Sequence, residues 1–309
     1  MNDGEMGREA TLRGTVSALA SGESRGKMCH LRDAGEPLPA QTAIEEIITL
    51  SRSVLFPGYF GTGDVNSLNL EYTIGAQVEK LKSLLDDQIL AGLILGARRE
   101  GRGFSLEALS AKAHDISAEF IASLPGLRAV LQTDVDAVYV GDPAAVSYDE
   151  VIYCYPSVKA IINYRIAHKL YEQGVPVIPR MISESAHSET GIDIHPGATI
   201  GSHFAIDQGT GVVVGATAVI GDNVKLYQGV TLGARSFDLD ENHNPVKGIP
   251  RHPIIGDNVV VYSNASILGR VRIGSNAVIG GNLWVTFDVG PGEKVVQAKA
   301  DNILRFKNE

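Results

Sequence analysis

From Ile192 to about Val289 the chain repeats an aliphatic residue at every sixth position. One register runs without interruption from Ile255 to Val285, with glycine or asparagine close behind many of its aliphatic residues. An amphipathic helix has a period near 3.6 residues and a half-buried strand a period of 2, so a sustained period of six fits neither alone. The pattern is typical of hexapeptide repeats, in which three short strands make one coil of a parallel β-helix.

The six-residue pattern is disturbed at two places. An early run through Ile194, Ile200 and Ile206 resumes at Val214, two residues out of register. Between Leu232 and Ile255 the repeats give way to a polar segment, residues 234–250, which we expect to leave the solenoid as an extruded loop. Loops that leave a rigid scaffold often carry function.

Helical patterns precede the repeats. Apolar stripes predict helices over residues 44–54, 68–95, 106–121 and 158–170, and the third is expected to end at Pro125-Gly126. Residues 1–40 show neither period and are expected to be a flexible lead-in. The sequence therefore predicts an α+β protein with an N-terminal α-helical domain over 41–185, a C-terminal parallel β-helix over 186–290 and a tail over 291–309.

Composition narrows the class of protein. Hydrophobic residues make up 44% of the 309 residues, yet no uncharged run reaches the ~18 residues of a membrane span. We therefore expect a soluble protein that does not bind membranes. A net charge of −9 argues against a nucleic-acid partner. Cys29 and Cys154 are the only cysteines, so we expect no disulfide framework and a reducing, cytoplasmic location.

Several short motifs closely resemble the serine O-acetyltransferase family. They are Asp193-Ile-His195-Pro196, Asp207-Gln208-Gly-Thr-Gly211, Gln228-Gly-Val-Thr-Leu-Gly233 and Arg251-His252-Pro253, preceded by Asp142-Pro143 and Tyr164-Arg165-Ile-Ala-His168. The family has a left-handed β-helix of hexapeptide repeats and transfers acetyl from acetyl-CoA to L-serine, giving O-acetyl-L-serine for cysteine biosynthesis. The resemblance covers about residues 142–288 and implies the same fold and reaction here.

The resemblance also implies roles for single residues. Asp142 and Asp207 match the two carboxylates that bind the serine amino group, and Arg251 matches the arginine that binds the serine carboxylate. His252 matches a histidine of the pocket, and Asp193 matches the acid that orients the catalytic histidine. Carboxylates at one end and a guanidinium at the other suit a zwitterionic amino acid.

The acetyl-CoA site of the family lies in a groove between neighbouring β-helices of a trimer. The matching positions here are Gly233, Ser263, Gly280 and Gly281, whose small side chains would let the ligand lie against the backbone. We therefore expect a homotrimer, or a hexamer built from two. No metal is expected, because the histidines show no metal-ligand spacing.

Two further partners follow from the family. L-cysteine is expected as a feedback inhibitor. O-acetylserine sulfhydrylase binds a family tail that ends in isoleucine, whereas this sequence ends Phe306-Lys-Asn-Glu309, which argues against that complex unless the tail is truncated.

The chain departs from the family at the catalytic base. Where the family has Asp-His, this sequence has Asp207-Gln208. A general base must take the proton of the serine hydroxyl as its oxygen attacks the thioester, and a glutamine amide has no useful basicity. A second departure is Ala216, where many members have glutamate.

Three explanations of Gln208 remain open. The first is a His-to-Gln change in an otherwise active enzyme, the second is a branch in which His195 or His252 is the base, and the third is a pseudoenzyme that binds without turnover. Two alternatives to serine acetylation also remain: a hexapeptide acyltransferase for another acceptor, such as a sugar or an antibiotic, and a non-catalytic scaffold that recruits the next enzyme.

Overall fold

The computed structural model describes residues 3–25, 36–61, 63–236 and 239–298, and the end of the predicted tail, with Phe306–Glu309, lies outside them. The chain divides into two compact units, Met1–Leu38 and Pro39–Glu309. The first unit contains α1 (Asp3–Ala20) and α2 (Gly22–Arg25), although the sequence analysis found no helical period there. The described side chains of α1 are exposed on every side, so no apolar stripe marks this helix.

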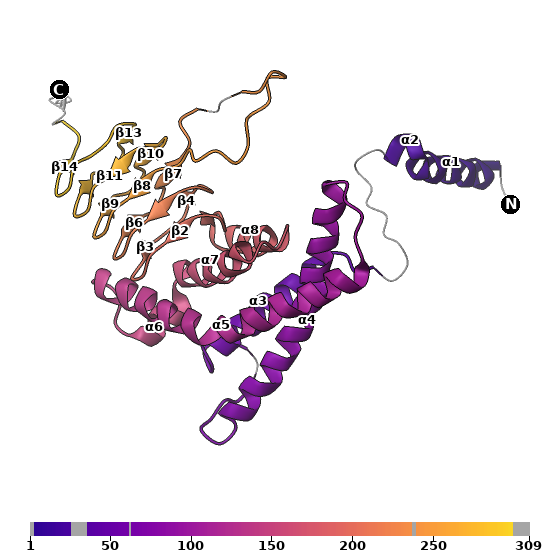
Figure 1. Ribbon diagram of the computed structural model, residues 1–309, viewed down its shortest axis with the longest axis horizontal. Helices are drawn as coiled ribbons and strands as arrows, with labels where there is room; N and C mark the ends of the chain where they lie inside the picture. Colours follow the sequence, from indigo (N-terminus) through magenta and orange to yellow (C-terminus); the bar gives the residue numbers. More distant parts are fainter. Residues whose placement is uncertain (1–2, 26–35, 62, 237–238, 299–309) are drawn as a thin grey trace, which may run out of the picture. The chain divides into compact units, whose positions relative to one another are not determined.

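The second unit begins with helices that pack around a continuous apolar core (Figure 1). They are α3 (Gln41–Leu55), α4 (Leu70–Arg99), α5 (Leu106–Gly141), α6 (Tyr148–Cys154), α7 (Pro156–Glu172) and α8 (Ile178–Thr190). Helices α6 and α8 were not predicted, and the expected domain boundary at residue 185 falls inside α8. Its buried stripe is short, with Ile178, Ile182 and Ala186 four residues apart between polar residues.

Helix α5 corrects one expectation. The sequence predicted its end at Pro125-Gly126, but the helix continues to Gly141 with Pro125 inside it. Leu124 and Leu131 are buried on the two sides of the proline. Packing of this long apolar face outweighs the cost of about 3 kcal/mol that a proline imposes inside a helix.

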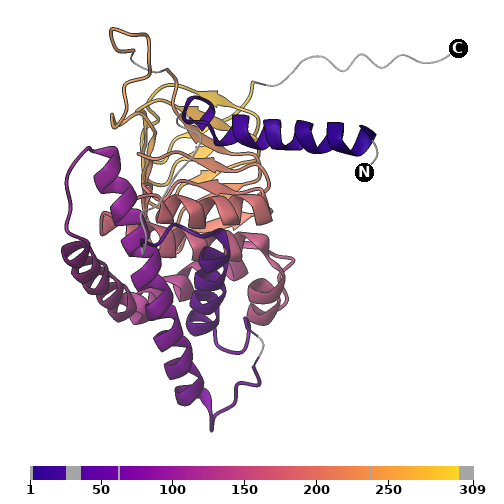
Figure 2. The same cartoon turned by 90° about the vertical axis from the view of Figure 1, so that its right-hand side faces the viewer.

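The repeats form a solenoid of parallel strands, as predicted (Figure 2). Three sheets run along it, in the orders β1-β4-β7-β10-β13, β2-β5-β8-β11 and β3-β6-β9-β12-β14. The left-handed sense of the coil stays a prediction. The strands are β1 (Asp193–Ile194), β2 (Thr199–Ile200), β3 (Ala205–Asp207), β4 (Val213–Val214), β5 (Val219–Ile220), β6 (Lys225–Tyr227), β7 (Thr231–Gly233), β8 (Ile254–Ile255), β9 (Val260–Val261), β10 (Ser266–Leu268), β11 (Arg272–Ile273), β12 (Val278–Ile279), β13 (Trp284–Val285) and β14 (Lys294–Val295).

The six-residue aliphatic positions point into the solenoid. Ile255, Val261, Ile267, Ile273 and Ile279 are each at most 1% exposed. The corners between strands carry the asparagines, and five of them have positive φ: Asn223, Asn258, Asn264, Asn276 and Asn282. Asparagine tolerates this left-handed backbone better than most residues, which explains its place in the repeat.

Helix α7 covers the open end of the first coil. Strand β2 lies at the edge of its sheet, and an edge strand exposes unpaired backbone groups. The Tyr164 hydroxyl donates to the carbonyl of Ala198 at 2.7 Å, and Arg165 donates to the carbonyls of Ile200 and Gly201 at 2.6 and 2.5 Å. Arg165 also forms a buried, bidentate ion pair with Asp134 of α5, with both N–O distances 3.0 Å.

We predict that Asp134→Asn lowers the free energy of unfolding by about 3–5 kcal/mol, because it leaves the Arg165 guanidinium buried without its counter-charge. Denaturant titration measures the change. The control is Glu46→Gln, whose ion pair with Lys80 is on the surface and should change stability by less than about 0.5 kcal/mol. Equal losses in both variants would show that the buried pair does not fasten the helices to the solenoid.

Candidate active site

The residues predicted for the site fall on two of the three corners of the solenoid. At the first corner the chain passes from sheet β3-β6-β9-β12-β14 into sheet β1-β4-β7-β10-β13, and at the second corner it passes from that sheet into sheet β2-β5-β8-β11. The register places Asp207, Tyr227, Tyr262 and Gly280 in one row at the first corner. The next row holds Gln208, Gln228, Ser263 and Gly281.

Gln208 stands in the most irregular turn of the first corner. The two extra residues between Ile206 and Val214 are accommodated here, and Gln208 has a φ of 59°. Gly209 follows with a φ of 95° and is buried against Ile192, so a side chain at position 209 would collide with it. The register shift therefore pushes Gln208 out of the solenoid, and its side chain is exposed.

Asp142 and Asp207 approach each other from different parts of the fold. Asp142 directly follows the end of α5 and does not begin a helix, although it stands before Pro143. Its carboxylate accepts hydrogen bonds from the Ala144 backbone and, at 2.6 Å, from the Tyr155 hydroxyl. The Tyr155 hydrogen bond is the main cause that holds the pKa of Asp142 below its usual value. Asp207 ends β3 and lies 2.7 Å from the ammonium of Lys225. One small cavity is lined by Asp142, Tyr155, Asp207 and Lys225, among others.

Asp193 lies on β1, on the face between the two corners. Its Oδ1 is buried and has no hydrogen-bond partner among the described residues, and the Arg180 guanidinium is 3.8 Å away. Among the described contacts, no hydrogen bond joins Asp193 to Gln208. A buried carboxylate oxygen without a donor is costly, so Asp193 is an acceptor that the described residues leave without a hydrogen bond.

His252 is held tightly at the second corner. Its ring lies against Gly215, where an added Cβ would be 2.0 Å from the imidazole, so only glycine fits there. The Thr217 backbone N–H donates to His252 Nδ1 at 3.0 Å, and the Thr217 hydroxyl is 2.8 Å from the same atom. Because Nδ1 accepts, the hydrogen-bond network assigns the ring proton to Nε2. Burial, helped by Arg251, His195 and Arg270, lowers the pKa of His252 to about 4.

His195 is in a similar state. It follows β1 in the row that continues to Gly215 and Gly233, and its Nδ1 accepts from the Gly197 backbone at 2.9 Å. Burial and then Arg180 lower the pKa of His195. Neither His195 nor His252 therefore presents a free ring nitrogen that could take a proton, and His252 is too acidic for that role near neutral pH.

Arg251 supplies positive charge at the second corner. Its backbone N–H donates to the Thr217 hydroxyl at 2.9 Å, which fixes the end of the extruded loop on the solenoid. A cavity of about 160 Å³ there is lined by Arg235, Arg251 and Arg270, among others. Arg270 is tied down by hydrogen bonds to the carbonyls of Thr217 and His252. The corner thus suits an anionic group.

The positions predicted to bind acetyl-CoA are divided between the corners. Ser263 and Gly281 are stacked at the first corner, where a Cβ on Gly281 would be 3.0 Å from the Ser263 carbonyl oxygen. Since neighbouring strands are ~4.8 Å apart, Ser263 lies roughly 10 Å along the solenoid from Gln208. Gly233, in contrast, ends β7 at the second corner. A ligand that touches both sets cannot lie on one corner alone.

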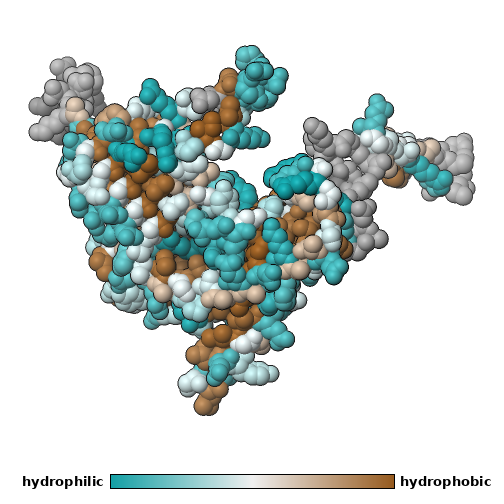
Figure 3. Space-filling view, in the orientation of Figure 1, coloured by the Kyte–Doolittle hydropathy of each residue, from teal (hydrophilic) through white to brown (hydrophobic). Residues whose placement is uncertain are grey.

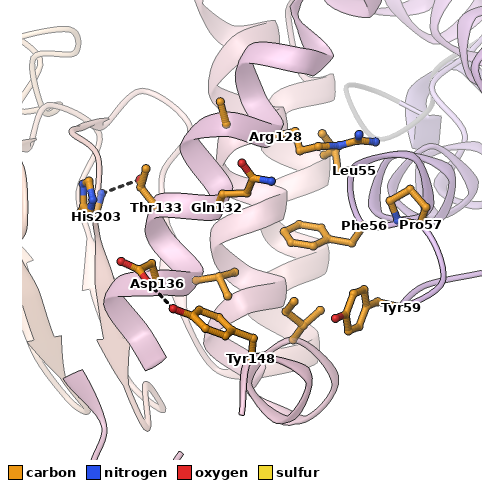
Figure 4. Close-up of a pocket in the computed structure, with 13 residues that line it drawn as sticks. Leu55, Phe56, Pro57, Tyr59, Arg128, Gln132, Thr133, Asp136, Tyr148 and His203 are labelled. Atoms are coloured by element: carbon orange, nitrogen blue, oxygen red, sulfur yellow. Dashed lines mark hydrogen bonds between the residues drawn. The ribbon is translucent and has the colours of Figure 1, made fainter. Parts of the chain in front are cut away.

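Two other features of the fold resemble sites. Glu184, His187 and Asp193 have ligand atoms within 4.8 Å of one another, but the Arg180 guanidinium forms ion pairs with both carboxylates. The group therefore supports no metal assignment. A larger cavity, of about 610 Å³, lies between α3, α5 and α6 and is lined by Arg128, Tyr148 and other residues (Figure 4). It contains none of the predicted site residues.

Four residues around the site were not singled out from the sequence: Tyr155, Arg180, Thr217 and Lys225. For Lys225 the alternation along the strand was such a signal. Lys225 comes one position before an inward-pointing leucine, and Asp207 comes one position after an inward-pointing isoleucine. Both side chains therefore face outward on neighbouring strands. The places of the other three residues at the site depend on how the helices and the loop pack on the solenoid. No local sequence pattern shows this packing.

Comparison with known proteins shows which proteins this chain is similar to. The bacterial transferase hexapeptide (six repeats) family model matches residues 252–286. The chain is 44% identical over 302 residues to a plasmid serine acetyltransferase of Synechococcus elongatus, covering 96% of this chain and 95% of that protein. Serine acetyltransferase 1 of Entamoeba histolytica, solved in complex with L-cysteine, matches with a TM-score of 0.71 and 36% identity over 86% of this chain and 90% of that one. Soybean serine acetyltransferase complexed with serine matches with a TM-score of 0.52 and 29% identity, over 84% and 98%.

The lowered pKa of His252 predicts a pH dependence of stability. An unfolded histidine has a pKa of about 6.5, whereas folded His252 takes up a proton only near pH 4. As pH falls through this window the unfolded chain binds the proton first, so the free energy of unfolding falls. His252→Gln should reduce this slope in denaturant titrations between about pH 6.5 and about pH 4.

His243→Asn is the control, because His243 is exposed in the extruded loop and its loss should leave the slope as it is. A slope unchanged by His252→Gln would contradict the burial of a neutral imidazole at the second corner.

Proposed function

Because the chain belongs to the serine acetyltransferase family, we propose that it transfers the acetyl group of acetyl-CoA to the L-serine hydroxyl, with slow turnover because Gln208 occupies the position of the base. The observation that carries the proposal is the pair of complementary corners. Asp142 and Asp207 form an ammonium-binding end, and Arg251 with its neighbouring arginines forms a carboxylate-binding end. An amino acid has an ammonium group for the first end and a carboxylate for the second.

The proposed reaction needs a proton acceptor that these residues do not supply well. The serine hydroxyl loses its proton as its oxygen attacks the thioester carbon, and the coenzyme A thiol leaves. His195 and His252 accept hydrogen bonds at Nδ1 and so carry their proton on Nε2, which supports a role as donors to the substrate rather than as bases. The unsatisfied Oδ1 of Asp193 is the acceptor that an imidazole at position 208 would use. With glutamine there, proximity of the bound reactants sustains the reaction.

A complete site requires two chains. The ammonium and carboxylate of serine are attached to one carbon atom, yet within one chain the face that carries β1 separates Gln208 from His195 and His252. This face is three to four extended residues wide, which separates the two corners by roughly 10–13 Å. The face also exposes apolar side chains, including Val213 and Trp284, and Figure 3 shows apolar surface over the solenoid. We propose that the second corner of one chain meets the first corner of the next in a trimer, with acetyl-CoA between them.

The same site would hold L-cysteine, because cysteine carries the ammonium and carboxylate of serine. The Entamoeba enzyme was solved with L-cysteine. Gln208 also favours a second candidate, a homologue that binds these ligands without turnover. Activity measurements on Gln208 variants separate the two.

We expect Gln208→His to raise the turnover of serine and acetyl-CoA by about 10²–10⁴ with little change in the dissociation constant of either ligand. The imidazole gains a partner in Asp193 and can accept the hydroxyl proton, so the gain falls on the transition state. Coenzyme A release and calorimetry measure the two quantities, and Gln208→Asn is the control without a base. Equal turnover in both variants would place the base elsewhere, and absence of turnover in all of them, with intact binding, would favour the binding homologue.

Subunit mixing tests the two-chain site. In the Gln208→His enzyme, chains carrying Arg251→Ala and chains carrying Asp207→Asn should each form inactive trimers. Trimers refolded or co-expressed from both should recover activity at about one quarter of their sites, because a site then combines an intact corner from each chain. Sedimentation confirms the assembly. If the mixture stays inactive while its trimers form normally, both corners serve a site within a single chain.

A further inference from the structure

We propose that the Lys225 ammonium occupies the subsite for the amino group of the substrate when no substrate is bound. An amino-acid substrate then binds by displacing this ammonium. This inference rests on the proposed function, because it assigns the amine subsite to Asp142 and Asp207. It adds a residue that competes with the substrate and thereby sets the selectivity of the site.

The surroundings of Lys225 are those of an ammonium-binding site. Its Nζ lies 2.7 Å from Asp207 Oδ2 and donates to the Gly141 carbonyl at 2.7 Å. The Tyr227 ring is beneath it, with Nζ 4.5 Å from the ring centroid, and Tyr227 in turn stacks on Tyr262. A carboxylate, a carbonyl and an aromatic face are the groups that bind a primary ammonium most strongly.

The second carboxylate of the subsite faces the same ammonium. The charge of Lys225 contributes to the lowered pKa of Asp142, after the hydrogen bonds from Tyr155 and Ala144. Asp207 and Lys225 are both largely withdrawn from solvent, at 16% and 17% side-chain exposure. Lys225 therefore neutralises a pair of carboxylates that would otherwise repel each other in a poorly solvated place.

The subsite is closed while Lys225 is in place. The cavity between Asp142, Tyr155, Asp207 and Lys225 measures about 10 Å³, which is about the room of one water molecule. A substrate ammonium cannot reach both carboxylates unless Nζ leaves. The four-carbon stem of lysine allows this movement, and the released ammonium can be hydrated outside.

This exchange of one ammonium for another predicts a selectivity. L-serine supplies a cation that replaces Lys225, so the two carboxylates stay neutralised. 3-Hydroxypropionate has the same hydroxyl and carboxylate but no amino group, so it cannot displace Lys225. With Lys225 removed, serine loses its competitor, whereas the anion meets two uncompensated carboxylates.

Calorimetry with both ligands tests the proposal on the full-length protein and on Lys225→Met, Lys225→Gln and Lys225→Arg. We expect the two neutral variants to bind serine about tenfold more tightly, the scale of one charge-assisted hydrogen bond, and to bind 3-hydroxypropionate no better than the wild type. Lys225→Arg keeps a cation at the subsite and should resemble the wild type with both ligands. Glutamine retains a hydrogen bond to Asp207, so it serves if the methionine variant folds poorly.

Two results would overturn the proposal. Weaker or unchanged serine binding in both neutral variants would show that Lys225 positions Asp207 rather than competing with the substrate. Parallel changes for serine and 3-hydroxypropionate would show a general structural effect. Absence of serine binding in every protein, wild type included, would instead overturn the proposed function itself.

Discussion

An aliphatic residue at every sixth position points into the solenoid and stacks on its counterpart in the next coil. This stacking fixes the positions of the other solenoid residues. Ile206, Leu226, Val261 and Ile279 are buried one above the next. The residue that follows each of them must therefore face outward at the same corner. The site is a consequence of this constraint, because Asp207, Tyr227 and Tyr262 come into one row and Gln208, Ser263 and Gly281 into the next.

The constraint is relaxed where the chemistry is proposed to occur. Two extra residues between Ile206 and Val214 give the first corner a turn that the other coils lack, and Gln208 takes a positive φ in it. Backbone in the left-handed region is uncommon for such a residue, and the stacked coils on either side hold it there. The second irregularity, the loop over residues 234–250, delivers Arg251 and His252 to the second corner, where Thr217 anchors them.

Periodicity was sufficient to predict the solenoid and helices α3, α4 and α7, because their apolar residues recur at fixed spacing. It failed for the end of α5, where burial on both sides of Pro125 overrides a local helix-breaking signal. It also missed α6, which has only 7 residues, and α8, whose buried stripe is short. For the site, the motifs indicated the residues but not their grouping. The division into two corners depends on strand register, and the hydrogen bonds of Thr217 that argue against His252 as a base depend on how the loop returns to the solenoid.

The charges of the two corners are complementary, and within one chain the face that carries β1 lies between them. We therefore propose that serine lies between two copies of the chain. The most direct measurement is a crystal structure of the protein with L-serine bound. We expect the amino group at Asp142 and Asp207 of one chain and the carboxylate at Arg251 of its neighbour. Serine held entirely by residues of one chain, or found only in the cavity between α3, α5 and α6, would contradict it.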